Sequence, residues 1–286
     1  MKNIKYFFQF FLIIILFLIF KILGFKMSSH IGGKLFEMIG PLFRSNKLIH
    51  SNIKKAIIGS SIKEIDRITK LMWNSYGRIF AEYMFIKNLR KSKFNSVIKV
   101  EGQEILDDIK KNDKQVVFIS GHFSNFELMA MHLDKTGIKL AAIYRPLNNI
   151  FLNRIMEKIR KKYICKNQIK KGIGGLKKLI SLKKNNYSTA LMIDQRVSEG
   201  IESNFFNHQA STTTIPAQLI KKFKIPIVPI YIERNNDINF KITINEPIIF
   251  SDELSIQDIT DRLNRILEKM IIHKPEQWIW SHNRWK

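Results

Sequence analysis

Residues 115–127 read QVVFISGHFSNFE, an apolar run that ends abruptly in a polar motif. The run Gln115–Ser120 is short, rich in β-branched residues and stopped by Gly121, which predicts a buried strand. Two more runs of this kind, KLAAIY at Lys139–Tyr144 and STALMI at Ser188–Ile193, also end in polar residues. Because helical segments alternate with them, we predict an α/β fold with a mostly parallel central sheet covered by helices.

The chain after residue 60 supplies further elements of both kinds. Apolar residues at three- and four-residue steps predict helices, and short apolar runs predict strands. We expect helices at 62–86, 104–111, 128–133, 148–161, 176–184, 216–223 and 256–272, and additional strands at 97–100, 225–232 and 239–244. Gly172–Gly175 is expected to break the chain. Ligand sites in such sheets lie beyond the carboxyl ends of the strands, where three polar motifs stand.

The charge of the chain is strongly basic. Lys and Arg number 48 against 24 acidic residues, a formal net charge of +24. Such a surplus favours an anionic partner, and nucleic acid, an acidic protein and anionic lipid all fit this description. A compositional bias toward Lys, Ile and Asn explains the same surplus, and both explanations stay open. The single cysteine, Cys165, excludes an intramolecular disulfide, and no Cys/His cluster has the spacing of zinc ligands.

An apolar segment opens the chain. Tyr6–Phe20 reads YFFQFFLIIILFLIF and continues past Lys21 to Phe25, which is about the length needed to cross a bilayer. A cleaved signal peptide is the rival interpretation, but no A-x-A-like site follows. A helix lying in the membrane interface also fits. We predict an uncleaved transmembrane anchor over residues 1–26 and one catalytic domain over residues 27–286.

The motif after the strand at Gln115–Ser120 contains a histidine and a glutamate five positions apart. Within one helix, His122 and Glu127 would point about 140° apart, so they meet only if His122 lies on the loop and Glu127 on the first helical turn. A carboxylate there would fix the imidazole tautomer and make the ring a general base. The alternative is structural, because Ser124 to Glu127 also has the Ser-x-x-Glu pattern of a helix capping box.

The same motif carries a family resemblance. Gly121-His122-Phe123, followed four residues on by Glu127, resembles the His-x-x-x-x-Asp/Glu motif of glycerolipid and lipid A acyltransferases. The Phe-Glu-Leu sequence at 126–128 resembles, more narrowly, the late lipid A acyltransferases of the lauroyl/myristoyl type. Further blocks of that family follow in order between about residues 97 and 286: Tyr144-Arg145-Pro146, Lys171–Gly175, Asp194-Gln195, Phe205-Phe206-Asn207 and Pro275-Glu276-Gln277-Trp278.

The resemblance implies a glycerolipid-acyltransferase-like fold and an O-acyltransferase activity. The enzyme would move a fatty acyl chain from acyl-acyl carrier protein to a hydroxyl of a phosphorylated lipid A precursor, with no cofactor and no metal. His122 would be the general base and Glu127 its orienting carboxylate. Asp194 is expected to organise Arg145 or the active-site loop. The side chains expected to bind substrate are Arg145, Asp194, Asn125 and Gln195. The protein would be a single-pass protein of the bacterial inner membrane, with its catalytic domain on the cytoplasmic side.

Two other functions remain open at this stage. One is an acyltransferase for another membrane lipid, such as a glycerolipid, against which the block Pro275–Trp278 argues. The other is a non-catalytic, membrane-tethered basic module that binds nucleic acid or anionic lipid. Because no nucleic-acid motif is present and aromatic residues are not interleaved along a basic stripe, we expect no nucleic-acid partner.

Overall fold

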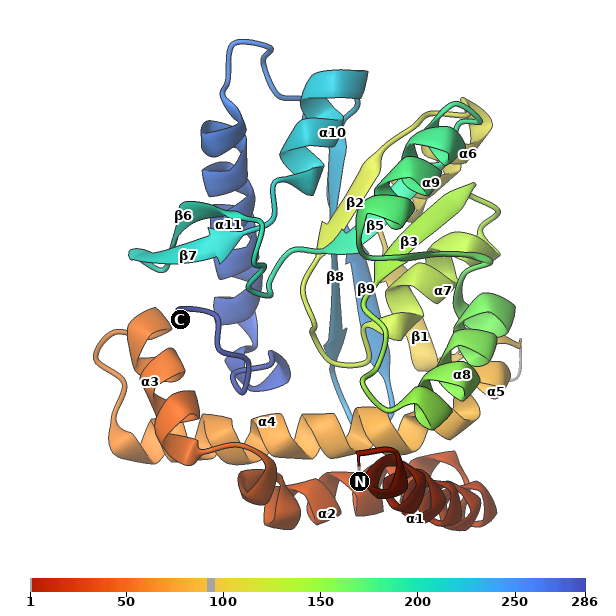
Figure 1. Cartoon of the computed structure of the whole chain (residues 1–286), viewed down its shortest axis with the longest axis vertical. Helices are drawn as coiled ribbons and strands as arrows, with labels where there is room; N and C mark the ends of the chain where they lie inside the picture. The colour runs from red at the N-terminus through yellow and green to blue at the C-terminus, as the bar shows by residue number, and fades with distance from the viewer. Residues whose placement is uncertain (1, 92–95) are drawn as a thin grey trace.

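A computed structural model of the chain describes residues 2–91 and 96–286 (Figure 1). Its centre is a seven-stranded sheet in the order β1 (Ile98–Glu101), β9 (Phe240–Ile244), β8 (Ile227–Arg234), β2 (Val117–Ser120), β5 (Ser188–Met192), β3 (Leu140–Tyr144) and β4 (Asn167–Lys170). The five strands from β8 to β4 are mutually parallel. Only the β8–β9 pair is antiparallel, and β1 runs parallel to β9. The predicted α/β class with a mostly parallel sheet is confirmed.

The central strands lie in the hydrophobic core because they are short apolar runs. All four residues of β2 and seven of the eight residues of β8 are buried. In the register of the sheet, Phe118 of β2 pairs with Ala190 of β5, which pairs with Ala142 of β3. Because directly paired residues of neighbouring strands point to the same face of the sheet, this row places one large side chain beside two small ones.

Helices flank the sheet, and each of the seven predicted helical segments contains one; α5 is additional to these seven. The helices from α4 onward are α4 (Ile62–Glu82), α5 (Ile86–Arg90), α6 (Gln103–Lys111), α7 (Glu127–Lys135), α8 (Ile150–Ile159), α9 (Ile173–Lys183), α10 (Ile215–Phe223) and α11 (Ile256–His273), with short helical turns η1 (Tyr83–Phe85), η3 (Arg160–Ile164) and η4 (Pro275–Gln277). The predicted chain break at Gly172–Gly175 is wrong in part, because α9 includes Gly174 and Gly175. Gly175 packs so closely on the Lys170 carbonyl oxygen that no side chain would fit there.

Several elements were not predicted. Strand β4 is one, and the antiparallel hairpin of β6 (Ile201–Phe205) and β7 (His208–Thr212) is another. Its two turn residues, Phe206 and Asn207, have φ angles of 52° and 58°, in the left-handed region that Asn tolerates better than most residues. The helices α2 (Phe25–Phe43) and α3 (Asn46–Ala56) were not predicted either.

Helix α4 crosses one end of the sheet, and the first two helices of the chain, α1 (Lys2–Leu23) and α2, form a layer beyond it (Figure 1). Helix α1 contains one segment, Asn3–Leu23, that is long and apolar enough to cross a membrane. One side of α1 packs on the domain: Phe17 lies 4.9 Å from Phe80 of α4 between ring centroids, and Asn149 donates to the Tyr6 carbonyl oxygen at 2.8 Å. The opposite side is exposed and carries Ile4, Phe7, Phe8, Phe11, Leu12, Ile15, Leu18, Ile19 and Ile22.

Candidate active site

His122 and Asp194 meet at the carboxyl ends of two neighbouring strands. Strands β2 and β5 are adjacent and parallel, and Ser120 pairs with Met192 at their ends. His122 and Asp194 therefore each stand two residues beyond a paired position, which brings them together although they are 72 residues apart in the sequence. The Asp194 carboxylate bonds to His122 Nδ1 at 2.8 Å and accepts the His122 backbone N–H at 2.8 Å.

Asp194 is fully buried and accepts a third hydrogen bond, from Nε1 of Trp278 at 2.9 Å. Burial alone would raise its pKa, but the charge of His122 and these hydrogen bonds lower the pKa to about 2. An ionised carboxylate only accepts hydrogen bonds, so the Nδ1 atom of His122 carries the proton and Nε2 is left as the basic nitrogen. Burial lowers the pKa of His122, but the charge and hydrogen bond of Asp194 outweigh it, so the pKa is raised.

Glu127 is bonded to a different partner. Its carboxylate accepts from Nε of Arg160 at 2.8 Å, and both side chains are nearly buried beside the same cavity as His122. No oxygen of Glu127 is within hydrogen-bond distance of the imidazole among the described contacts, so the pairing expected from the His-x-x-x-x-Glu spacing is not formed in the structure. Glu127 still lies near enough for its charge to contribute to the raised pKa of His122.

The capping box expected at Ser124–Glu127 is also wrong. Helix α7 begins at Glu127, its N-cap residue is Phe126, and no side chain caps it. Ser124 instead has a φ angle of 41°, in the left-handed region, and its backbone N–H donates to the Gln277 carbonyl oxygen at 2.9 Å. The loop of residues 121–126 is thus a strained turn rather than a helix start.

A cavity of about 600 Å³ opens in front of His122. Its inner wall is apolar, and the row of Phe118, Ala190 and Ala142 lies along it. The two alanines leave room that larger side chains would fill. The remaining apolar lining residues are Ile119, Phe126, Met129, Ala130, Leu133, Ile143, Pro146, Leu147, Ile164, Leu191, Met192, Val197, Ile215 and Ile230. This part of the cavity suits a hydrocarbon chain.

Cationic side chains also line the cavity. Besides Arg160, they are Arg44, Arg145, Lys171 and Arg196, and no ion pair of these four is recorded within residues 2–91 and 96–286. Burial and the neighbouring positive charge of Arg145 lower the pKa of Lys171. The charge of Glu199 opposes this shift, but the cationic side chains that line the cavity outnumber the carboxylates there, which favours an anion.

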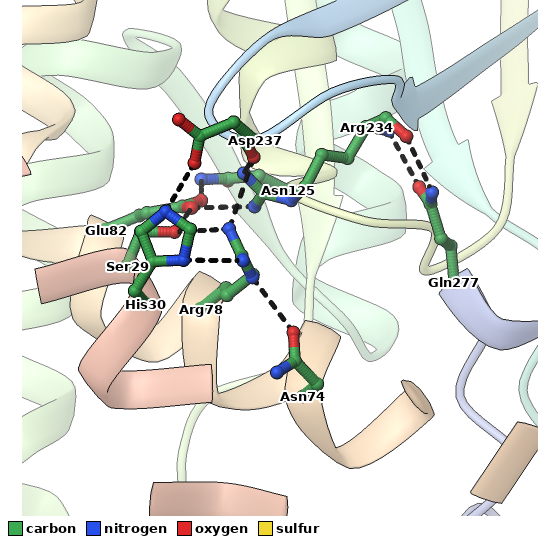
Figure 2. Close-up of polar contacts among 9 residues, drawn as sticks. All are labelled: Ser29, His30, Asn74, Arg78, Glu82, Asn125, Arg234, Asp237 and Gln277. Carbon is green, nitrogen blue, oxygen red and sulfur yellow. Dashed lines mark hydrogen bonds and ion pairs between the residues drawn. The ribbon is translucent and has the colours of Figure 1, made fainter. Parts of the chain in front are cut away.

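The structure separates the other predicted site residues into two groups. Gln195 lines the cavity, as does Arg145. Asn125 does not line it: its side chain is buried and donates to Glu82 (Figure 2). The carboxylate of Asp194 accepts the backbone N–H of His122 and has no recorded bond to Arg145, and its expected role in organising the loop stays a prediction.

The C-terminal residues 277–282 contact the site through hydrogen bonds. Gln277 holds the backbone of Arg234 through two hydrogen bonds of 2.7 and 2.8 Å, and Trp278 holds Asp194. His282 lines the cavity, and its Nε2 accepts the backbone N–H of Arg196 at 3.0 Å. Burial lowers the pKa of His282 to about 4, so this ring is neutral with its proton on Nδ1. The sequence indicated an aromatic packing cluster here, and the donor role of Trp278 was missed because strand order is needed to foresee it.

The site thus combines an α/β sheet, a histidine–carboxylate pair and a cavity whose lining contains both apolar and cationic side chains, which is typical of a class of protein that handles lipids with charged groups. The family model for bacterial lipid A biosynthesis acyltransferases matches residues 1–286, and the chain belongs to that family. The predicted family resemblance is thereby confirmed.

Individual relatives are distant. The chain is 25% identical over 197 residues to lipid A biosynthesis acyltransferase 2 of Shigella flexneri, covering 66% of this chain and 60% of that protein. It is 25% identical over 189 residues to the lipid A biosynthesis myristoyltransferase of Escherichia coli (strain K12), covering 63% and 56%. It is also 25% identical over 252 residues to the lauroyltransferase of the same pathway and strain, covering 85% and 79%.

Proposed function

We propose that the protein is an O-acyltransferase that moves a fatty acyl chain from acyl-acyl carrier protein to a hydroxyl of a phosphorylated lipid A precursor. The observation that carries this proposal is the His122–Asp194 pair, which leaves the basic Nε2 of the ring facing a cavity with an apolar wall and a cationic lining. Membership of the lipid A acyltransferase family supports the class of acceptor. The names of the relatives, a myristoyltransferase and a lauroyltransferase, support a saturated acyl donor.

The reaction follows from the protonation states. Nε2 of His122 takes the proton of the acceptor hydroxyl as its oxygen attacks the thioester carbonyl carbon, and Asp194 stabilises the imidazolium that forms. The tetrahedral oxyanion then collapses, the C–S bond breaks, and the imidazolium returns its proton to the departing thiolate. The products are an ester and a free thiol. Each step uses groups that the chain or the two substrates supply, and none needs a cofactor or metal.

The two kinds of cavity lining suggest where each substrate part binds. The apolar wall along Phe118, Ala190 and Ala142 suits the acyl chain, since burying each methylene contributes about 0.8 kcal/mol. Arg145 and Lys171 suit a phosphate of the acceptor. The formal net charge of +24 suits an acidic carrier protein and an anionic lipid alike.

A membrane location fits the exposed apolar side of α1. We propose a single-pass anchor over residues 1–26 in the bacterial inner membrane, with the domain of residues 27–286 on the cytoplasmic side, where acyl carrier protein resides. The apolar segment Asn3–Leu23 and exposed Met27, Ile31, Met38 and Leu42 of α2 support this location. Leu147 lines the cavity and is half-exposed, so a lipid acceptor can enter the cavity past this apolar residue.

The test is an acyl-transfer assay of the full-length protein in detergent or vesicles. Purified acyl carrier protein charged with defined fatty acids is the donor, and a tetraacylated or pentaacylated phosphorylated disaccharide is the acceptor. We expect an ester product with the wild type and a rate at least about 10³-fold lower with His122→Ala. Wild-type transfer that His122→Ala leaves intact would refute the mechanism.

A second candidate rests on the Gly-His-Phe motif, which glycerolipid acyltransferases share. An acceptor of that kind would be a glycerol phosphate or lysophosphatidate. Offering both acceptors in one assay separates the candidates, and we expect product from the disaccharide only. A non-catalytic basic module, the third possibility, predicts salt-sensitive binding of anionic vesicles and no ester from either acceptor.

A further inference from the structure

A buried polar network lies beneath the catalytic loop of residues 121–126, between α2, α4 and the β8–β9 turn (Figure 2). Its centre is Glu82 of α4, which is 0% exposed. The Glu82 carboxylate accepts from Ser29 Oγ at 2.6 Å, from the Arg234 guanidinium at 2.7 Å and from Asn125 Nδ2 at 2.9 Å. A buried carboxylate needs such partners, since an unpaired one costs several kcal/mol.

One of these bonds reaches the catalytic loop. Asn125 is three residues beyond His122 and is 1% exposed, so Glu82 fixes it from inside the protein. The intervening Ser124 has a φ of 41°, a conformation that persists only where the surroundings impose it. The loop is therefore held at three points, by Asp194 on the backbone N–H of His122, by the Gln277 carbonyl oxygen on Ser124 and by Glu82 on Asn125.

Another bond of Glu82 reaches the layer formed by the N-terminal helices α1 and α2. Ser29 lies on α2, which starts immediately after the apolar helix α1. Helices α2 and α4 cross in close contact at Gly32 and Gly77, where a Cβ on Gly32 would stand 2.5 Å from the Gly77 carbonyl oxygen. This approach is what lets the short Ser29 side chain reach Glu82.

The network extends on both sides of that crossing. Arg78 of α4 donates to Ser29 Oγ at 3.2 Å and contacts His30 Nδ1 at 3.0 Å. Asp237 in the β8–β9 turn pairs with His30 (Figure 2), and it also pairs with Lys26 at 2.8 Å. Helix α2 is thus bonded through polar side chains both to α4 and to the turn that follows Arg234.

We infer that Glu82 is a positioning residue that joins the catalytic loop to α2, so that the placement of His122 depends on how α2 docks on α4. The inference rests on the proposed function for its kinetic readout only. Its physical content is that a change at Ser29, on the far side of Glu82 from the loop, alters the geometry of His122. Groups that orient a functional residue from behind it commonly change activity by about 10- to 100-fold when removed.

Two adjacent serines supply a matched pair of variants. Ser28 and Ser29 are both 0% exposed on α2, but Ser28 Oγ donates to the Phe20 carbonyl oxygen at 2.6 Å and has no recorded contact with Glu82. We expect Ser29→Ala to lower kcat about 10-fold with KM for donor and acceptor within about twofold of wild type. Ser28→Ala is expected to keep wild-type kcat, although it loses a buried hydrogen bond of the same kind.

A double-mutant cycle locates the effect at Glu82. Asn125→Ala removes the loop's bond to the carboxylate, and with that bond gone Ser29→Ala has nothing further to disturb in the loop. We expect the double variant to have the kcat of Asn125→Ala alone. Multiplicative losses, or equal losses in Ser28→Ala and Ser29→Ala that follow their melting temperatures, would overturn the inference.

A second readout does not need turnover. With histidine labelled on its ring nitrogens, Ser29→Ala should shift or broaden the His122 resonances while Ser28→Ala leaves them in place. If the wild type transfers no acyl group, the proposed function fails and these spectra still decide the inference. Unchanged His122 resonances in Ser29→Ala would overturn it even in an active enzyme.

Discussion

Two buried carboxylates lie near His122 and have different partners. Asp194 follows strand β5 and bonds to the imidazole of His122, whereas Glu127 starts helix α7 and bonds to the guanidinium of Arg160. Glu127 is five residues from His122 and Asp194 is 72 residues away, yet Asp194 is the group in contact. The difference teaches that the order of strands in the sheet, rather than distance along the chain, determines which acid meets the histidine.

The strongest way to break this comparison is to remove the charge of Asp194. Asp194→Asn keeps the shape but offers an amide to Nδ1, which no longer favours the Nδ1–H tautomer or the imidazolium. We expect kcat to fall by about 10³- to 10⁴-fold, as in other histidine–carboxylate pairs. Steady-state acyl transfer measures the loss, and circular dichroism serves as the control for folding. A fall of less than about tenfold would mean that Asp194 does not orient the base.

The matching change at the other pair is Glu127→Gln. It leaves the Arg160 guanidinium nearly buried without its carboxylate, which should cost about 3 kcal/mol of unfolding free energy. Because the His122–Asp194 bonds are intact, we expect kcat to fall only about tenfold. Denaturant unfolding and acyl transfer are measured on the same preparations. If Glu127→Gln loses as much kcat as Asp194→Asn while remaining stable, the carboxylate at 127 has the orienting role expected from sequence.

These same residues show which parts of the fold and of the site can be predicted from the sequence. Apolar runs and helical periods locate β2, β3, β5, α4 and α11, because burial and amphipathicity are local properties. They also place His122, Arg145 and Asp194 at strand ends. They do not give the order of the strands in the sheet. There β5 lies beside β2, although β3 comes between these two strands in the chain. The bond from Trp278 to Asp194 and the network around Glu82 depend on equally long-range packing.

Arg145 differs from Asp194 and Glu127 in that no ion pair of its side chain is recorded within the described ranges. It follows β3 as Asp194 follows β5, but it is exposed. We expect Arg145→Ala to raise KM for the phosphorylated acceptor about tenfold with little change in kcat or stability, because it removes a contact made to bound substrate. Arg145→Lys should recover part of that loss, and a dephosphorylated acceptor should show no difference between the variants. Equal losses with both acceptors would exclude a phosphate contact.

The pH dependence gives the smallest effect and has opposite signs for activity and stability. The neutral ring of His122 is the base, so kcat/KM should rise as pH increases through a pKa above the ordinary value of 6.5. The folded state favours the charged ring, so the stability from this histidine is present below pH 6.5 and is lost as pH rises through the raised pKa.

For Asp194 the direction is reversed. Its pKa is lowered from 3.8 to about 2, so its stabilisation is present above pH 3.8 and is lost as pH falls toward 2. Rate profiles and thermal unfolding across the pH range measure both. A kcat/KM that falls as pH rises from 6 to 8 would contradict a neutral histidine base.

The most direct measurement of the central claim is an NMR titration of His122 in the wild type, Asp194→Asn and Glu127→Gln. Ring-nitrogen labelling identifies the resonance among the seven histidines by its absence in His122→Ala. We predict that the pKa of His122 lies above 6.5 in the wild type, falls below 6.5 in Asp194→Asn and shifts only slightly in Glu127→Gln. A large fall in Glu127→Gln with none in Asp194→Asn would contradict the assignment of Asp194 as the carboxylate that holds the catalytic histidine.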